Sequence, residues 1–393
     1  MAEIKVIMLG GKRVGKSTIL AGIIETLGLQ GDLSTHFICE DNTDYAAYSN
    51  FSIKAKYKNL VRLIDAKRPG SIFMTRGLGD SKIQKYNISL RLSNKPGKLM
   101  VDFYDVPGEF TNPKNIEFKS EMLPLIEDCD VFIVGIDTPY LMECSESVNN
   151  AHNRITDLEV ALQNIMVKDK TDLKMVMFVP LKCEKWIQEG KINDVVSKVK
   201  VAYSTLLKTL SAYPLMVVSI LPIATVGGIQ FSRMAPALVI KREGVLTGYS
   251  CISQPGNEVL LSDGNHYKVE PPYSIDNDPE AVIDGLKIPN AWFELSPNAT
   301  YSPMNCEQTA LHILRFLIVK TVYKQLISEK ENSRFFGYIR NALNSLMNWW
   351  NGIDYDAFKS LISDLQKEGK IKDSVEGIEM QHVCEEWKEV ELC

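Results

Sequence analysis

The sequence predicts an α/β fold in which a mostly parallel sheet carries helices on both faces, with a β-rich insertion and C-terminal helices added to it. Strand-like and helix-like stretches alternate through residues 1–225, the pattern of parallel strands joined by crossover helices. Residues 226–305 are instead rich in Pro, Gly and Asn, with short β-like runs. After them, apolar residues return at helical spacing.

The expected elements follow from this alternation. Strands are expected at 4–9, 86–92, 98–104, 131–136, 173–181 and 215–223. Helices are expected at 17–27, 45–65, 116–126, 149–166 and 195–210. The segment Ser93-Asn94-Lys95-Pro96-Gly97 is a turn signal, so the two strands that flank it should form a hairpin.

The remainder of the chain divides into three parts. We expect 226–305 to be a β-rich insertion, in which Asp263-Gly264 forms a tight turn between two short strands. A helix at 307–328 should return to the sheet, so that 1–225 and 306–330 form one domain. Residues 331–393 then form a C-terminal helical extension with an acidic tail, in which Asp354 caps a second amphipathic helix that Gly369 ends.

Composition excludes several classes of function. The chain has 393 residues and a net charge of −5, and residues 352–393 hold 11 acidic against 5 basic side chains. The sequence contains no basic stripe, so it does not predict nucleic-acid binding. The 8 cysteines contain no C-x-x-C pair, which favours reduced thiols in a cytoplasmic protein. No apolar run is long enough to span a membrane, although Trp349-Trp350 on an aromatic helix leaves a peripheral membrane contact open.

A glycine-rich stretch between the first strand and the first helix predicts a phosphate-binding loop. It fits the pattern G-x-x-x-x-G-K-[ST], whose backbone N–H groups point at phosphate oxygens and whose helix adds the positive end of its dipole. Lys16 would place its charge between the β- and γ-phosphates, and Ser17 would be a ligand for Mg²⁺. The expected phosphate-contacting residues are Gly10, Gly11, Lys12, Arg13, Val14, Gly15, Lys16, Ser17 and Thr18.

A second motif, Asp105-Val106-Pro107-Gly108-Glu109, follows the strand that closes the hairpin. In a site that hydrolyses a nucleotide, Asp105 would hold Mg²⁺ through water and the Gly108 amide would sense the γ-phosphate. Glu109 would then lie where an attacking water must be oriented. The alternative is a plain strand-to-helix turn.

With these two motifs the chain resembles the Ras-like and translation-factor (TRAFAC) class of P-loop GTPases, over residues 1–225 and 307–328. The form of the second motif and the large insertions also resemble bacterial conflict-system GTPases of the double-GTPase type. The resemblance implies GTP or GDP as ligand and Mg²⁺ as cofactor. It also implies signalling to a protein effector or through self-association.

The base-reading motif of this class, [N/T]-K-x-D, is altered here. Strand order places Leu181-Lys182-Cys183-Glu184 at its position. Lys182 could lie over the purine, and Glu184 could accept from both donors of guanine, whereas Leu181 cannot replace the Asn or Thr. A further base contact is expected near Thr225. An ordinary Lys/Glu pair at a strand end remains the alternative.

The switch and catalytic residues also depart from the class. Thr75 is the preferred switch residue for Mg²⁺ and the γ-phosphate, with Thr35 as the alternative. Glu109 stands in place of the usual catalytic Gln or His, and Lys12 would obstruct an arginine supplied by a partner. We therefore expect slow GTP hydrolysis. The alternatives are a nucleotide-bound scaffold with negligible turnover and an ATP-using P-loop NTPase.

Overall fold

The computed structural model describes the central part of the chain and separate stretches of the insertion and the C-terminal region. The longer described ranges are 3–28, 37–45, 82–93, 99–168, 173–213, 215–236, 238–243, 245–250, 286–297, 299–331 and 355–372. Shorter ones include 72–74, 374–375 and 378–381. Thr35, Thr75, most of the helix expected at 45–65 and the helix expected around Trp349-Trp350 lie outside the described residues.

Within these residues, nine strands form one sheet with the order β19-β20-β8-β7-β6-β1-β5-β4-β2. The five central strands are parallel: β1 (Glu3–Leu9), β5 (Leu99–Asp105), β6 (Val131–Asp137), β7 (Lys174–Leu181) and β8 (Met216–Ile220). Antiparallel strands β4 (Gln84–Leu92) and β2 (Phe37–Asp41) complete one edge. This confirms the α/β fold with a mostly parallel sheet.

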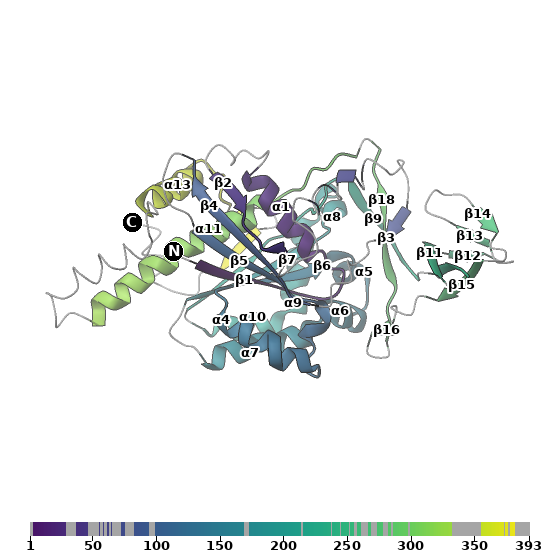
Figure 1. Cartoon of the computed structure of the whole chain (residues 1–393), viewed down its shortest axis with the longest axis horizontal. Coiled ribbons are helices and arrows are strands. Elements are labelled where there is room, and N and C mark those ends of the chain that lie inside the picture. Colours follow the sequence, from purple (N-terminus) through teal and green to yellow (C-terminus); the bar gives the residue numbers. More distant parts are fainter. Residues whose placement is uncertain are drawn as a thin grey trace.

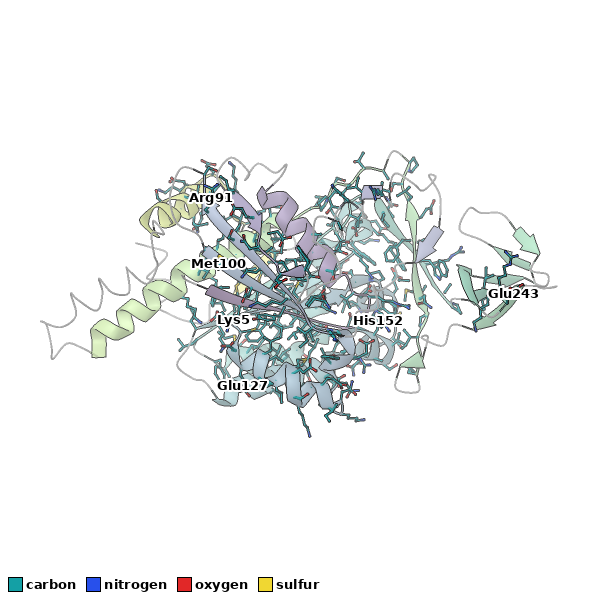
Figure 2. The ribbon with its side chains drawn as sticks, in the orientation of Figure 1. Lys5, Arg91, Met100, Glu127, His152 and Glu243 are labelled. Atoms are coloured by element: carbon teal, nitrogen blue, oxygen red, sulfur yellow. The ribbon has the colours of Figure 1, made fainter. Side chains whose placement is uncertain are left out.

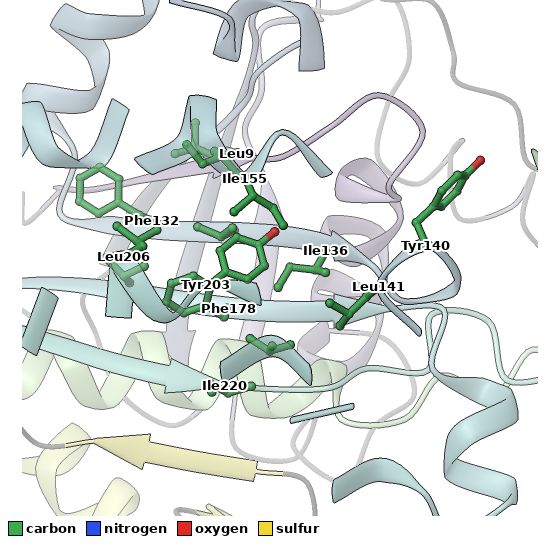
Figure 3. Close-up of a cluster of buried hydrophobic side chains, with 14 of the residues drawn as sticks. Leu9, Phe132, Ile136, Tyr140, Leu141, Ile155, Phe178, Tyr203, Leu206 and Ile220 are labelled. Atoms are coloured by element: carbon green, nitrogen blue, oxygen red, sulfur yellow. The ribbon is translucent and has the colours of Figure 1, made fainter. Parts of the chain in front are cut away.

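Two hydrophobic clusters cover the two faces of this sheet. Alternate residues of β1 divide between them: Val6 and Met8 enter one cluster, Ile7 and Leu9 the other. The first cluster packs against α1 (Lys16–Gly28) and α11 (Cys306–Glu331). The second, drawn in part in Figure 3, packs against α7 (Ile155–Lys168), α9 (Ile192–Ala202) and α10 (Ser204–Ser211). Every residue of β6 and β7 is buried, as expected of parallel strands covered on both faces.

Three helices differ from expectation. The helix expected at 149–166 is two helices, α6 (Glu146–Asn153) and α7, because Arg154 between them adopts a left-handed conformation with φ 56°. The helix expected at 195–210 is likewise divided into α9 and α10 at Tyr203. The helix expected at 116–126 begins as a π-helix at Phe118–Met122 and continues as α4 (Leu123–Asp128). Pro124 explains the π turn, because it lacks the N–H that an α-helix would need there.

The insertion is built of small sheets that lie beside the carboxyl ends of the parallel strands (Figure 1). Its inner sheet has the order β3-β18-β9, with β9 at Ile229–Ala235 and β18 at Asn290–Leu295. β3 (Ile72–Met74) comes from the part of the chain between α1 and β4. An outer sheet joins β10 (Leu238–Arg242), β11 (Val245–Ser250) and β15 (Tyr273–Asn277). Short strands at Glu258–Leu260 and His266–Lys268 pair as the expected hairpin.

The C-terminal region also contributes to the main sheet. Helix α13 (Tyr355–Lys367) packs on α11, and its residues Ile362 and Leu365 are buried in the same cluster as α11. The chain then forms β19 (Ser374–Val375) and β20 (Ile378–Gln381), and β20 pairs antiparallel with β8. These two strands were not predicted from the sequence.

Candidate nucleotide-binding site

The phosphate-loop residues connect β1 to α1 at the point where the strand order reverses. The chain leaves β1 with β5 on one side and β6 on the other, and open parallel sheets bind ligands at such a point, outside the carboxyl ends of the strands. Gly10 and Gly15 have φ of +136° and +114°, values that only glycine adopts readily. The two glycines therefore give the loop the tight backbone bends that a phosphate cradle would need.

Gly11 and Val14 of the loop are constrained by close packing. A Cβ on Gly11 would lie 2.0 Å from the carbonyl oxygen of His152, so α6 supports the loop from behind. Figure 2 labels His152 beside this end of the sheet. Val14 is fully buried in the core below the loop. Arg13 adopts a left-handed conformation with φ 63°.

Lys16 lies folded over its own loop. Its ammonium group donates to the carbonyl oxygens of Gly10 and Gly11 at 3.1 and 3.0 Å. Burial lowers the pKa of Lys16, while Asp105 and Glu109 oppose that shift. A partly desolvated cation beside backbone N–H groups is a suitable partner for a phosphate anion. Thr18 continues into α1, its N–H bonded to Gly15 O at 3.0 Å.

The second motif lies against this loop. Ser17 Oγ donates a hydrogen bond to Asp105 Oδ2, which joins the first residues of α1 to the end of β5. A Cβ on Gly108 would lie 2.4 Å from the backbone nitrogen of Lys12. Gly108 therefore permits a close backbone contact between the two motifs. Glu109 adds an ion pair with Lys12, 3.1 Å between Nζ and Oε1, in which both side chains are about half exposed.

The donor set fits Mg²⁺, which prefers oxygen ligands and is held by few protein groups when phosphates supply the rest. Ser17 and Asp105 provide a hydroxyl and a carboxylate that already touch. Among the described residues no group of three or more His, Cys, Asp and Glu side chains could hold a metal. A magnesium site of the kind expected here needs no such group.

Lys182 links the strand ends to the phosphate loop. It follows β7 in a left-handed conformation with φ 62°, and its Nζ donates to Arg13 O at 2.9 Å and to Asp137 Oδ2 at 2.6 Å. His152 Nε2 lies 3.3 Å from the same carboxylate oxygen. The ring of His152 stacks on that of Tyr140. The result is a buried charged cluster directly behind the loop.

Glu184 and Thr225 lie together at the first turn of α8 (Glu184–Gln188). Glu184 Oε1 accepts hydrogen bonds from Thr225 Oγ1, Val226 N and Gly227 N, at 3.2, 2.9 and 3.3 Å. Burial raises the pKa of Glu184, and hydrogen bonds from the backbone N–H groups of Val226, Glu184 and Gly227 and from Thr225 oppose the shift. The carboxylate is thus fixed against the loop that follows β8.

The structure brings most of the predicted residues to one end of the sheet. Lys16, Ser17, Asp105 and Gly108 meet at the phosphate loop, and Lys182 joins them through Arg13. Asp137 was missed by the sequence analysis, although its position gave a signal. It ends β6, next to β1, and the carboxyl ends of adjacent parallel strands meet at one edge.

Comparisons with known proteins add little to this geometry. No family model matches the chain, and no curated protein is similar to it in sequence. Among solved structures, it is similar to the GTP-bound GTPase-like domain of Ski7 from S. cerevisiae, with a TM-score of 0.33 and 11% identity over 77% of this chain and 72% of that one. We draw nothing further from so distant a likeness. Among the described residues, no helix has the length and apolar character needed to cross a membrane.

The buried cluster predicts a specific sensitivity to acid. Burial favours a raised pKa for Asp137, but Lys182 and His152 outweigh it and hold the pKa below its usual value. The stability that Asp137 contributes is therefore fully present above its unfolded-state pKa of about 3.9 and lost as pH falls through its lower folded-state pKa. Asp137→Asn should cost about 3 kcal/mol or more at neutral pH, since it leaves Lys182 buried without its charge partner.

Urea unfolding at a series of pH values measures this effect. Below about pH 4, the unfolding free energy of Asp137→Asn should fall less steeply with acidification than that of the wild type. The control is Glu379→Gln, which removes a half-exposed ion pair with Lys200 and should cost less than about 1 kcal/mol. An unchanged acid slope in Asp137→Asn would show that another carboxylate is responsible.

Proposed function

We propose that this chain binds a guanine nucleotide with Mg²⁺ and hydrolyses GTP slowly, acting as a switch for a protein partner. The observation that carries the proposal is the contact between the two motifs, at the point where the strand order of the sheet reverses. Ser17 bonds to Asp105, and Gly108 packs on the backbone of Lys12. A phosphate cradle joined to a strand-end carboxylate is the arrangement that nucleotide hydrolysis requires.

In this proposal each residue has a defined task. The loop N–H groups and Lys16 bind the β- and γ-phosphates, and Ser17 and Asp105 hold Mg²⁺. A bound Mg²⁺ would offset the charge of the phosphate oxygens. Gly108 responds to the γ-phosphate because it already lies against the loop. Thr75 stays a prediction for the switch residue, and it directly follows β3, which pairs with the insertion.

Guanine selection is assigned to Lys182 and Glu184. The Lys182 ammonium is held at Arg13, which leaves its stem to lie along a purine face. The three hydrogen bonds to Glu184 all go to Oε1, so we assign Oε2 to the donors of guanine. Thr225 would act through Glu184, to which it donates.

One observation favours a second candidate, a nucleotide-bound scaffold with negligible turnover. The ion pair between Lys12 and Glu109 occupies the carboxylate that would orient water. Single-turnover hydrolysis of bound GTP separates the two functions. The third reading, an ATP-using enzyme, is separated by competition between GTP and ATP.

Nucleotide binding should stabilise the protein. At a GTP concentration about 100 times its dissociation constant, in the presence of Mg²⁺, linkage gives roughly 2.7 kcal/mol. Thermal unfolding followed by circular dichroism should show a clear rise in melting temperature that saturates with occupancy. ATP at the same concentration should give a smaller rise. A larger rise with ATP would overturn the guanine assignment, and no rise with either nucleotide would overturn the proposed function.

A further inference from the structure

An aromatic ring of the insertion lies against the charged cluster behind the phosphate loop. The Lys182 ammonium is 5.5 Å from the centroid of the Phe293 ring. Phe293 is 2% exposed and the Lys182 side chain 8% exposed, so the contact is shielded from water. A cation near an aromatic ring is attracted by the quadrupole of the ring, and the attraction grows when both groups are desolvated.

The backbone fixes where this ring lies. Phe293 is on β18, the middle strand of the inner sheet, and pairs with Phe73 of β3 on one side and Phe231 of β9 on the other. The register with β9 shifts between Trp292 and Phe293, an irregularity of the kind that redirects side chains beside functional sites. Both of these neighbouring residues are consequently buried. The ring of Phe231 meets that of Phe293 edge-on, with 6.2 Å between centroids.

The described partners of the Lys182 ammonium group come from three parts of the chain. Asp137 supplies a negative charge, the Arg13 carbonyl belongs to the phosphate loop, and Phe293 supplies the ring. An aliphatic side chain in place of the ring would remove the attraction of the ring quadrupole for this buried cation. Lys182 therefore contacts both the phosphate loop and a residue that is far away in the sequence.

We propose that Phe293 is a positioning residue of the nucleotide site, which seats the Lys182 ammonium so that it holds the Arg13 carbonyl of the phosphate loop. The proposal rests on the proposed nucleotide binding. It makes the inner sheet of the insertion a part of the binding site. Nucleotide affinity then depends on the insertion even where the insertion does not touch the nucleotide.

The test uses the full chain and a matched pair of variants. Phe293→Leu removes the ring and keeps an apolar side chain. Phe231→Leu makes the same change at the facing position, which is also buried and whose ring lies near Lys185. Titration with fluorescently labelled GDP, and with labelled GTP and Mg²⁺, gives the affinities. Phe293→Leu should weaken both by about 5- to 30-fold. Phe231→Leu should change them less than twofold.

A double-mutant cycle ties the effect to Lys182. In a Lys182→Met background, Phe293→Leu should have no further effect on affinity. If Lys182→Met does not fold, the combined Asp137→Asn, Lys182→Met background removes both charges and serves instead. Equal losses in the two leucine variants, or a loss that persists without Lys182, would overturn the proposal.

Failure of the proposed function can be recognised separately. A wild-type protein that binds neither labelled nucleotide refutes nucleotide binding, and the same cycle is then measured by urea unfolding of the protein alone. Coupling between Phe293 and Lys182 that exceeds the coupling between Phe231 and Lys182 supports the seating of the ammonium. Additive free energies of unfolding refute it.

Discussion

Lys16→Ala should weaken binding of GTP at least 100-fold. The variant removes a cation whose charge-assisted hydrogen bonds to phosphate oxygens contribute about 1.5–3 kcal/mol each, and each 1.4 kcal/mol is a factor of ten in affinity. In the structure the ammonium group donates to the loop carbonyls of Gly10 and Gly11, so a bound phosphate would give it a stronger, charged partner. Titration with fluorescently labelled GTP measures the loss.

The fold should survive this substitution. Lys16 is partly buried at the junction of the loop and α1, and its two hydrogen bonds to backbone contribute about 0.5–1.5 kcal/mol each. Lys191→Ala is the control, because this exposed lysine is outside the loop and pairs with Glu189. Circular dichroism should show the same helix content in both variants. A Lys16→Ala protein that binds GTP like the wild type would refute the phosphate-loop assignment.

The sequence predicts more of the candidate site than of the insertion. The phosphate loop and Asp105-Val106-Pro107-Gly108-Glu109 are local patterns, and strand order alone placed Lys182 at the end of β7. Phe293 has no such signal, because its relation to Lys182 arises from packing between segments that are distant in sequence. Strand order likewise could not show that Glu184 bonds to the loop at Thr225.

The missed strands have a similar cause. β3 and β19 are three and two residues long, too short for an alternating pattern to be recognised. Each forms beside a longer strand: β3 pairs with β18, and β19 pairs with β20, which pairs in turn with β8. The helix expected at 149–166 was divided for a different reason, since Arg154 adopts a left-handed conformation without being glycine.

The ion pair between Lys12 and Glu109 raises the question of what the carboxylate does during hydrolysis. Burial alone would raise the pKa of Glu109, but hydrogen bonds from its own backbone N–H and from Lys12 outweigh it and lower the pKa. A carboxylate with a lowered pKa is a weak base, because proton transfer is most efficient when the pKa lies near the working pH. Glu109 is therefore better suited to orient water than to deprotonate it.

Glu109→Ala should slow single-turnover hydrolysis of bound GTP by about 100-fold, because the attacking water loses the carboxylate that orients it. GTP affinity should change little, because Glu109 lies beyond the γ-phosphate in the proposed site. Rapid mixing with Mg²⁺ and separation of GTP from GDP measures the rate.

Lys12→Ala is the matched control, since it removes the same ion pair and leaves the carboxylate. If Glu109 orients water, Lys12→Ala should keep or increase the rate. If Glu109 instead repels the phosphate, Glu109→Ala should bind GTP more tightly and hydrolyse it at least as fast as the wild type. No hydrolysis in the wild type, even at concentrations that favour self-association, would identify the chain as a scaffold that registers a bound nucleotide.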